Sequence, residues 1–322
     1  MARLPMQAIL AAHRRLAPFA PRTPLVRSAA LSRLTGGEIW LKLECRQPTG
    51  SFKVRGALNK IGLLSPESRS RGLVTGSAGN HGLGVAYAAQ CWGVADAHIF
   101  VPESAPRAKV DKLRLFPVTV HQEGADYEAA HQDAEDFALA TGAVYVPAYD
   151  DPEVVAGQGT IALEVLAELP AADAILVPVG GGGMIAGIAT AAASLAPRCR
   201  VIGVQPTASP AALLSLRDGH AYDPYAAAPT IADGLAGGFG AVPFALAADL
   251  LDTILLANEA SLRRAVFELL DREQLVVEPS GAAAIAPLLD GALDAAGRTV
   301  VCILSGANIS TALLRAILAE RA

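Results

Sequence analysis

Lys53 is the first residue of the chain whose setting could support chemistry. It lies in the segment Pro48–Gly56, where glycine and apolar residues flank it. Such surroundings penalise the charged ammonium and favour the neutral amine. A neutral amine can form a Schiff base with a carbonyl compound or act as a general base. The same residues could also form the solvent-exposed start of a helix, so this segment alone leaves both interpretations open.

Four consecutive glycines, Gly180–Gly183, precede Met184 between an apolar strand-like run and an apolar helix-like run. Glycines let backbone N–H groups approach an anion, and the N-terminus of the following helix adds its positive dipole end. The pattern therefore predicts a phosphate-binding loop. A nucleotide P-loop would require Gly-Lys-Ser/Thr after the glycines, and none occurs.

A dinucleotide-binding loop is the closer alternative, because Gly181, Gly183 and Ala186 satisfy the pattern G-x-G-x-x-A. That motif also needs an acidic residue about 20 positions on, at the end of the next strand, to bind the ribose. Gln205 occupies this position. The dinucleotide interpretation is therefore less favoured.

Two further segments follow strand-like runs. Gly76–Gly82 contains Asn80 and His81 and opens a helix, so its N–H groups suit a carboxylate and the Asn80 amide suits an oxygen. A helix-capping turn with a structural His81 is the alternative.

Ser305 follows the run Val300–Leu304, at the strand end where open α/β sheets bind ligands. No Ser-His-Asp pattern surrounds it, which favours a hydrogen bond to a bound heterocycle over a nucleophilic role.

Together these segments resemble one family. The motifs occur in the expected order over almost the whole chain: the Lys53 segment, Ser77–His81, Ala156–Thr160, Gly180–Gly183, Ile231–Gly234, Glu278–Gly281 and Ser305–Asn308. They resemble the fold-type II pyridoxal-phosphate enzymes, in the threonine/serine dehydratase and serine racemase branch. The sulfur-amino-acid synthases of that fold usually carry Lys-Asp-Arg, whereas Lys53-Val-Arg55 is the dehydratase form.

The resemblance implies pyridoxal 5′-phosphate as cofactor, held by Lys53 as an internal aldimine. It implies that Phe52 lies beside the ring, that Asn80 bonds the ring hydroxyl and that Ser305 faces the pyridine nitrogen. The full set of cofactor residues that it implies is Phe52, Lys53, Asn80, Gly180, Gly181, Gly182, Gly183, Met184, Glu278 and Ser305. The substrate carboxylate would be held by Ser77, Ala78, Gly79, Asn80 and His81.

The activity implied is that of a dehydratase, or ammonia-lyase. It would eliminate water from a small β-hydroxy-α-amino acid of the threonine/serine class, giving a 2-oxo acid and ammonia, with Lys53 removing the Cα proton. A racemase of the same fold is the main alternative. In the racemases that the chain resembles, a serine stands at the position of Ala78, and a methyl group cannot exchange a proton. A nicotinamide-dependent oxidoreductase and a non-catalytic cofactor-binding protein are less favoured.

Many relatives hold Mg²⁺ or Ca²⁺ with a glutamate, a nearby carbonyl and an aspartate. The matching positions in this chain are Gln205, Ser209 and Ala211. Hard divalent cations select charged oxygen ligands, and both carboxylates are replaced. We therefore expect no divalent-cation site, unless the loop recruits another acid such as Asp218.

Short apolar runs rich in Val and Ile alternate with longer helical patterns, which predicts an α/β fold with parallel sheets. The predicted strands are 39–43, 72–75, 97–101, 118–121, 144–146, 174–179, 201–204 and 300–304. The predicted helices include 82–91, 125–141, 157–169, 184–195, 259–272 (with Asn258 as N-cap) and 281–289, and a long loop is predicted over 208–240.

The resemblance adds the tertiary organisation. It implies two open, twisted, mostly parallel sheets flanked by helices, as in the tryptophan synthase β-like fold. Residues 1–71 and 149–322 would form a large cofactor-binding domain, and residues 72–148 a small mobile lid. It also implies a homodimer.

Composition limits the remaining possibilities. The 322 residues are 52% hydrophobic and 18% charged, so the chain can bury a sizeable core. A net charge of −5 without a basic run argues against nucleic acid or an anionic membrane as main partner. The four scattered cysteines fit a reducing cytoplasm. The apolar stretch 6–12 is too short for a signal peptide, and proline and glycines interrupt the uncharged stretch 174–196.

Overall fold

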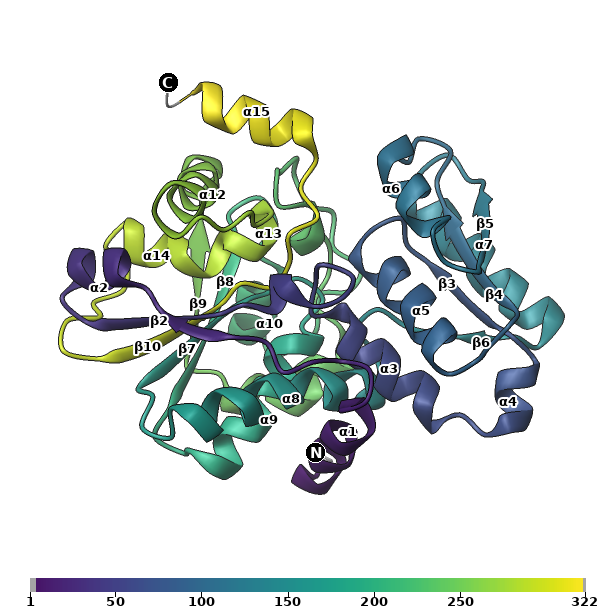
Figure 1. Ribbon diagram of the computed structural model, residues 1–322, viewed down its shortest axis with the longest axis horizontal. Helices are drawn as coiled ribbons and strands as arrows, with labels where there is room; N and C mark the ends of the chain where they lie inside the picture. The colour runs from purple at the N-terminus through teal and green to yellow at the C-terminus, as the bar shows by residue number, and fades with distance from the viewer. Residues whose placement is uncertain (1–3, 321–322) are drawn as a thin grey trace.

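The computed structural model describes residues 4–320 and contains two open sheets flanked by helices (Figure 1). The six-stranded sheet has the order β1-β2-β10-β7-β8-β9, and the four-stranded sheet has the order β5-β4-β3-β6. All neighbouring strands run parallel except β1 and β2. The strands are β1 (Leu25–Arg27), β2 (Glu38–Lys42), β3 (Leu73–Gly76), β4 (Ala97–Val101), β5 (Thr119–Gln122), β6 (Val144–Tyr145), β7 (Ala174–Pro178), β8 (Arg200–Pro206), β9 (Thr253–Ala257) and β10 (Thr299–Ile303).

Helices connect the strands and cover both sheets. The α-helices are α1 (Met6–Leu16), α2 (Ala29–Thr35), α3 (Lys53–Leu63), α4 (Pro66–Ser70), α5 (Asn80–Cys91), α6 (Arg107–Leu113), α7 (Tyr127–Thr141), α8 (Pro152–Glu168), α9 (Gly183–Leu195), α10 (Ala211–Asp218), α11 (Ala241–Ala247), α12 (Glu259–Glu273), α13 (Pro279–Ala282), α14 (Ala286–Leu289) and α15 (Thr311–Ala319). The short 3₁₀ helices are η1 (Glu44–Arg46), η2 (Asp233–Leu235), η3 (Ala248–Leu250) and η4 (Ala283–Ile285).

Both faces of the six-stranded sheet are buried. Helices α1, α8 and α9 lie below it in Figure 1, and α2, α12 and α14 lie above it. Successive side chains of a strand point to opposite faces. Val301 and Ile303 of β10 accordingly join one apolar core, and Val300 and Cys302 join the other. Burial on both sides explains why this strand is a continuous apolar run.

Helix α3 joins the two halves of the molecule. It packs against α5, beside the four-stranded sheet, and against α8, beside the six-stranded sheet (Figure 1). The contact with α8 depends on glycine, because a Cβ on Gly157 would lie 2.6 Å from the carbonyl oxygen of Arg55. The start of α3, where Lys53 lies, is therefore fixed between the two sheets.

The eight predicted strands are confirmed, with ends that differ by no more than two residues. Strands β1 and β9 were not predicted. β1 has only three residues, too few to show an alternating pattern. β9 follows the apolar helices α11 and η3 closely, so its own apolar run has no clear beginning in the sequence.

Two of the predicted elements were wrong in part. The predicted loop 208–240 contains the helix α10 and the short helix η2. The predicted helix 281–289 is divided among α13, η4 and α14. Pro287 lies in the first turn of α14, and its missing N–H cannot continue an α-helix from the preceding turn. The predicted N-cap is confirmed, since Asn258 accepts a hydrogen bond from the backbone N–H of Ser261.

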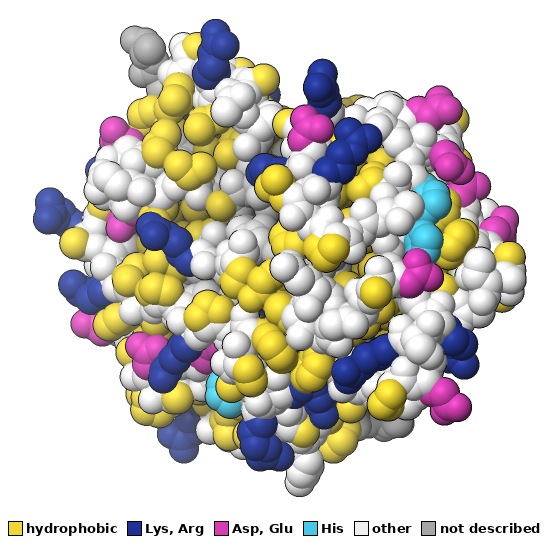
Figure 2. All heavy atoms as spheres, turned by 45° about the vertical axis from the view of Figure 1, so that its right-hand side comes forward, with side chains coloured by type: hydrophobic (Ala, Val, Ile, Leu, Met, Phe, Trp, Pro, Cys, Tyr) yellow, Lys and Arg dark blue, Asp and Glu magenta, His cyan; other side chains and the backbone are white. Residues whose placement is uncertain are grey.

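The uncharged stretch 174–196 forms β7, the glycine loop and α9, as predicted. Among residues 4–320, no helix is long and apolar enough to cross a membrane. On the face shown in Figure 2, Lys and Arg side chains are spread among Asp and Glu side chains and form no continuous basic surface there.

Candidate active site

Lys53 begins α3 and contacts the segment that leads into α8. Its Nζ donates a hydrogen bond of 2.8 Å to the carbonyl oxygen of Ala148. The same atom lies 5.4 Å from the centre of the Phe52 ring. Desolvation by the surrounding protein lowers the pKa of Lys53 to about 8, so a sizeable fraction of neutral amine exists just above neutral pH.

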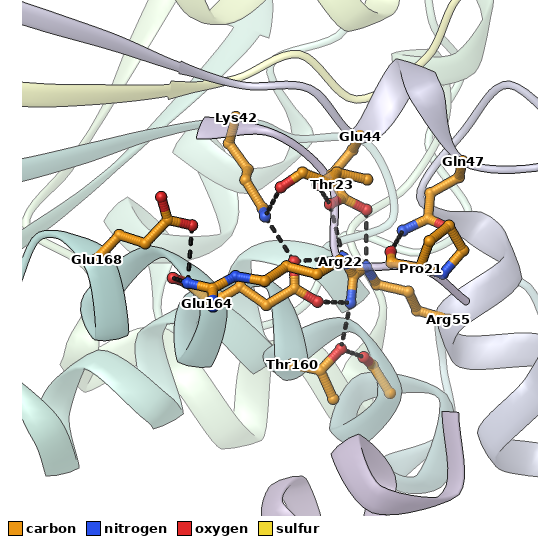
Figure 3. Close-up of polar contacts among 11 residues, drawn as sticks. Pro21, Arg22, Thr23, Lys42, Glu44, Gln47, Arg55, Thr160, Glu164 and Glu168 are labelled. Carbon is orange, nitrogen blue, oxygen red and sulfur yellow. Dashed lines mark hydrogen bonds and ion pairs between the residues drawn. The ribbon is translucent and has the colours of Figure 1, made fainter. Parts of the chain in front are cut away.

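Two residues further along α3, the Arg55 guanidinium lies between two buried carboxylates (Figure 3). It donates to both oxygens of Glu44 at 2.7 and 2.8 Å and to both oxygens of Glu164 at 2.7 and 2.9 Å. Lys42 Nζ bonds Glu164 at 2.5 Å, and the four charges balance. Burial alone would lower the pKa of Arg55, but Glu44 and Glu164 raise it, so the arginine stays charged.

The glycine loop connects β7 to α9, and aromatic rings pack against it. A Cβ on Gly181 would collide with the ring of Tyr149, and one on Gly182 would collide with the ring of Phe239. Gly182 also has φ +93°, a conformation that favours glycine. The first N–H groups of α9 have no partner within the helix. The loop therefore offers N–H groups beside the start of α9, and side chains are excluded at Gly181 and Gly182.

Ser305 follows β10 and is held next to the lysine segment. Its carbonyl oxygen accepts a hydrogen bond of 3.1 Å from the N–H of Phe52. Ser51 and Gly306 form an antiparallel bridge beside this contact. Ser305 is buried, so its hydroxyl lies within the protein close to the beginning of α3.

Asn80 and Glu278 meet at the junction between the two sheets. Asn80 is the first residue of α5, and its Nδ2 donates a hydrogen bond of 2.6 Å to Glu278 Oε1. Asn80 Oδ1 accepts one of 2.6 Å from Asn308 Nδ2. Burial raises the pKa of Glu278 to about 7. The carboxyl therefore titrates near neutral pH.

The predicted carboxylate site, Ser77–His81, comprises the turn Ser77–Gly79 and the first two residues of α5. The N–H of Gly79 donates to Ser77 Oγ at 3.3 Å. The His81 ring contacts the carbonyl oxygen of Val146 at 2.9 Å, and burial lowers its pKa to about 3. A neutral His81 that holds α5 against the segment after β6 agrees with the structural alternative for this residue.

Gln205, at the end of β8, caps the following helix. Its Oε1 accepts hydrogen bonds from the N–H groups of Ala212 and Leu213, at 3.0 and 3.2 Å. Ser209 Oγ contacts the backbone of Gly237 instead. The Gln205 side chain thus stabilises the start of α10. Among residues 4–320, no group of three or more His, Cys, Asp or Glu side chains could hold a metal ion.

Comparison with known proteins agrees with this geometry. Residues 16–306 match the model of the family described as pyridoxal-phosphate dependent enzyme. The chain belongs to this family. It is 42% identical to the L-threonine ammonia-lyase of Thermotoga maritima, over 97% of this chain and 78% of that protein. It is 38% identical to the catabolic L-threonine dehydratase TdcB of Escherichia coli, over 94% of this chain and 92% of that protein.

Solved structures of similar proteins have the same fold as this pyridoxal-phosphate-dependent enzyme. The processed threonine deaminase isoform 2 of Solanum lycopersicum has a TM-score of 0.90 at 34% identity, and the match covers 97% of this chain and 91% of that one. Maize serine racemase has a TM-score of 0.90 at 31% identity, covering 98% and 97%. The predicted fold class is confirmed.

The residues present fit pyridoxal phosphate. The fit rests on a desolvated lysine amine, a loop in which Gly181 and Gly182 exclude side chains, and a buried serine beside the lysine segment. The side chain of Met184 joins the apolar core, so only its backbone is available to a phosphate.

Three residues near the candidate site could not be assigned a role from the sequence. Tyr149 and Phe239 lie against the glycine loop, and Asn308 contacts Asn80. No spacing in the sequence indicates which ring meets which glycine. Asn308 lies in a recognised motif, but the motif alone does not indicate its partner.

Replacing Arg55 by leucine should destabilise the fold strongly. Glu44 and Glu164 would lose their shared partner while they stay buried, which costs about 3–5 kcal/mol. Denaturant unfolding measures the change. Arg263→Leu removes the more exposed ion pair with Glu320 and should change the free energy of unfolding by less than about 1 kcal/mol. Equal effects of the two substitutions would contradict the importance of the buried cluster.

Replacing Gly181 by alanine should weaken cofactor binding about tenfold or more, because overpacking against Tyr149 shifts the loop. Titration of the apoenzyme with cofactor, followed by absorbance, gives the affinity. The additional change Tyr149→Ala removes the ring and should restore part of the loss. If the double variant binds no better than Gly181→Ala alone, the collision lies with the cofactor rather than with Tyr149.

Chelation of divalent cations should leave activity unchanged. The Gln205 amide carries no charge, and its oxygen already accepts two backbone hydrogen bonds. The measurement is the turnover rate in excess chelator and again after addition of Mg²⁺. A several-fold loss that Mg²⁺ reverses would show that other residues hold a cation.

Proposed function

We propose that this protein is an ammonia-lyase that eliminates water from a small β-hydroxy-α-amino acid of the threonine/serine class. The products are a 2-oxo acid and ammonia. The observation that carries the proposal is the desolvated Lys53 amine at the start of α3, in a chain that resembles threonine ammonia-lyases. Its Nζ bonds the carbonyl oxygen of Ala148, next to the Tyr149 ring that lies against the glycine loop, and the preceding N–H of Phe52 bonds the carbonyl oxygen of Ser305. Pyridoxal phosphate, when bound, withdraws electrons from the Cα atom of an amino acid.

Each cofactor contact is proposed from the position of a residue. The N–H groups of Gly180, Gly181, Gly182, Gly183 and Met184 would hold the phosphate at the start of α9. Phe52 would lie beside the ring, and Asn80, supported by Glu278, would bond the ring hydroxyl. Ser305 would face the ring nitrogen. A neutral hydroxyl there does not force that nitrogen to protonate, which favours rapid loss of a β-hydroxyl over transamination.

Lys53 would act as the general base. Its pKa of about 8 makes the neutral amine available near neutral pH, and a neutral Nζ can take the Cα proton of the substrate. The hydrogen bond to the carbonyl oxygen of Ala148 would keep the Nζ atom in place. The substrate carboxylate would be bound by Ser77, by the backbone of Ala78, Gly79 and His81, and by Asn80, at the N-terminus of the 12-residue helix α5.

We also propose a large domain, residues 1–71 and 149–322, and a small lid domain, residues 72–148. The four-stranded sheet lies within residues 72–148, and the six-stranded sheet lies outside them. Closure of such a lid would exclude water from the reacting atoms. A homodimer in the cytoplasm is proposed as well; four free cysteines agree with a reducing compartment.

The lysine is tested by Lys53→Ala, with Lys60→Ala on the same helix as control. Loss of Lys53 should abolish the visible absorption of bound cofactor and all turnover of L-threonine and L-serine. Borohydride treatment of the unchanged holoenzyme should fix the cofactor on the peptide that contains Lys53, as seen by mass spectrometry. Turnover that survives Lys53→Ala, or cofactor fixed elsewhere, would refute the assignment.

Racemisation is the second candidate function, favoured by the similarity to serine racemases. It needs a proton donor on each face of the Cα atom, and Lys53 supplies only one. The position of the racemases' serine is Ala78, which carries a methyl group. Incubation with L-serine should therefore give pyruvate with little or no D-serine. D-serine formed as fast as pyruvate would show that another group serves the second face.

A further inference from the structure

Helix α6, beside the four-stranded sheet, carries two lysines that reach residues beside the six-stranded sheet. Lys109 Nζ pairs with Asp233 Oδ2 at 2.8 Å. Lys112 Nζ donates a hydrogen bond of 3.0 Å to Asn308 Oδ1. Residues three apart lie on the same face of a helix, so both contacts come from one face of α6.

The contact of Lys112 is the first of a chain of hydrogen bonds that ends at a buried carboxyl. Asn308 Nδ2 donates to Asn80 Oδ1 at 2.6 Å, and Asn80 Nδ2 donates to Glu278 Oε1 at 2.6 Å. Lys112 and Asn80 lie beside the four-stranded sheet, whereas Asn308 and Glu278 lie beside the six-stranded sheet. The chain therefore passes three times between the two halves of the molecule.

The direction of every bond in this chain follows from its lysine end. A lysine ammonium can only donate, so the oxygen of the Asn308 amide must face Lys112. The Asn308 NH₂ group then faces the carbonyl oxygen of Thr49, at 2.9 Å, and Asn80 Oδ1. The Asn80 NH₂ group is left to face Glu278. A reversed Asn308 amide would place N–H groups against an ammonium.

We propose that Lys112 is a positioning residue that, through Asn308, sets the orientation of the Asn80 amide when the two halves of the molecule are docked. The inference rests on the proposed function, because Asn80 is there assigned to the cofactor ring. It goes further by making the correct Asn80 orientation depend on α6. Binding groups would thus be aligned only when the four-stranded half lies against the six-stranded half.

The Lys109 pair differs from the Lys112 contact. The side chain of Asp233 is 64% exposed. It forms no hydrogen bond with Asn308, Asn80 or Glu278. Exposed ion pairs of this kind contribute little to stability. The Lys112 contact is exposed as well, so exposure does not distinguish the two lysines. They differ in their partners: Asn308 bonds Asn80, so only Lys112 connects to Asn80.

The test uses the holoenzyme with Lys112→Met, which removes the donor and keeps an unbranched side chain. Arg107→Met is the control, since it removes a positive charge from the same helix at a side chain that is 92% exposed. Loss of one hydrogen bond predicts about a threefold to tenfold fall in kcat for Lys112→Met with KM little changed. The absorption band of the bound cofactor should shift, the melting temperature should stay constant, and Arg107→Met should match the unchanged enzyme.

A double-mutant cycle with Asn308→Ala shows whether Lys112 acts through Asn308 or affects the enzyme by another route. If Lys112 acts through Asn308, Lys112→Met should add nothing to the loss caused by Asn308→Ala. Lys112→Arg keeps a donor and should restore most of kcat and the original absorption band. Additive losses, or a Lys112→Met enzyme indistinguishable from Arg107→Met, would overturn the proposal.

Failure of the proposed function would give a different experimental result from failure of the Lys112 proposal. If neither L-threonine nor L-serine is a substrate, the unchanged enzyme shows no turnover, yet the absorption band of its bound cofactor still reports on Asn80. An unaltered band in both Lys112→Met and Asn308→Ala would then refute the role of Lys112. A band altered to the same extent in both variants and in their double variant would support it.

Discussion

The buried pairing of Arg55 with Glu44 and Glu164 joins the elements on which the site depends. Arg55 belongs to α3, Glu44 follows β2, and Glu164 lies on α8, so one guanidinium connects three separate segments (Figure 3). Each carboxylate accepts two hydrogen bonds from it, which fixes the angle as well as the distance. Because α3 begins two residues earlier, the same contacts hold the backbone of Lys53. A buried ionic cluster stabilises a fold little compared with apolar side chains, but losing one partner is costly. The cluster thus selects one arrangement of these segments.

Around this fixed helix, the remaining residues of the candidate site come from the ends of strands. The glycine loop follows β7, Ser305 follows β10, and Asn80 begins the helix after β3. Carboxyl ends of parallel strands lie at one edge of a sheet, where loops can differ without disturbing the core. The two sheets meet at α3, which packs against helices of both. Residues more than 200 positions apart, such as Asn80 and Asn308, therefore come into contact.

The sequence was informative where burial or chemistry leaves a local pattern. Strands buried on both faces, such as β7 and β10, are short apolar runs and could be predicted; the three residues of β1 could not. Helix α10 was missed because its start depends on the Gln205 side chain, which comes from the preceding strand. The glycine loop could be predicted as an anion site. That Tyr149 and Phe239 pack against it could not, since ring contacts across the fold leave no signature in spacing.

Burial has opposite consequences for Arg55 and Glu164, on one side, and for Lys53 and Glu278, on the other. Lys42 does not follow the first pair, since burial lowers its pKa despite its bond to Glu164. At Arg55 and Glu164, burial opposes charge, but the partners overcome it, so the pKa of the arginine is raised and that of the glutamate is lowered. At Lys53 and Glu278, burial prevails. It lowers the pKa of the lysine to about 8 and raises that of the glutamate to about 7. Groups that titrate near neutral pH can exchange protons, whereas groups locked in matched pairs cannot. The protein thus keeps Arg55 and Glu164 charged where segments must be joined, and a titratable amine at Lys53, where we propose that a proton moves.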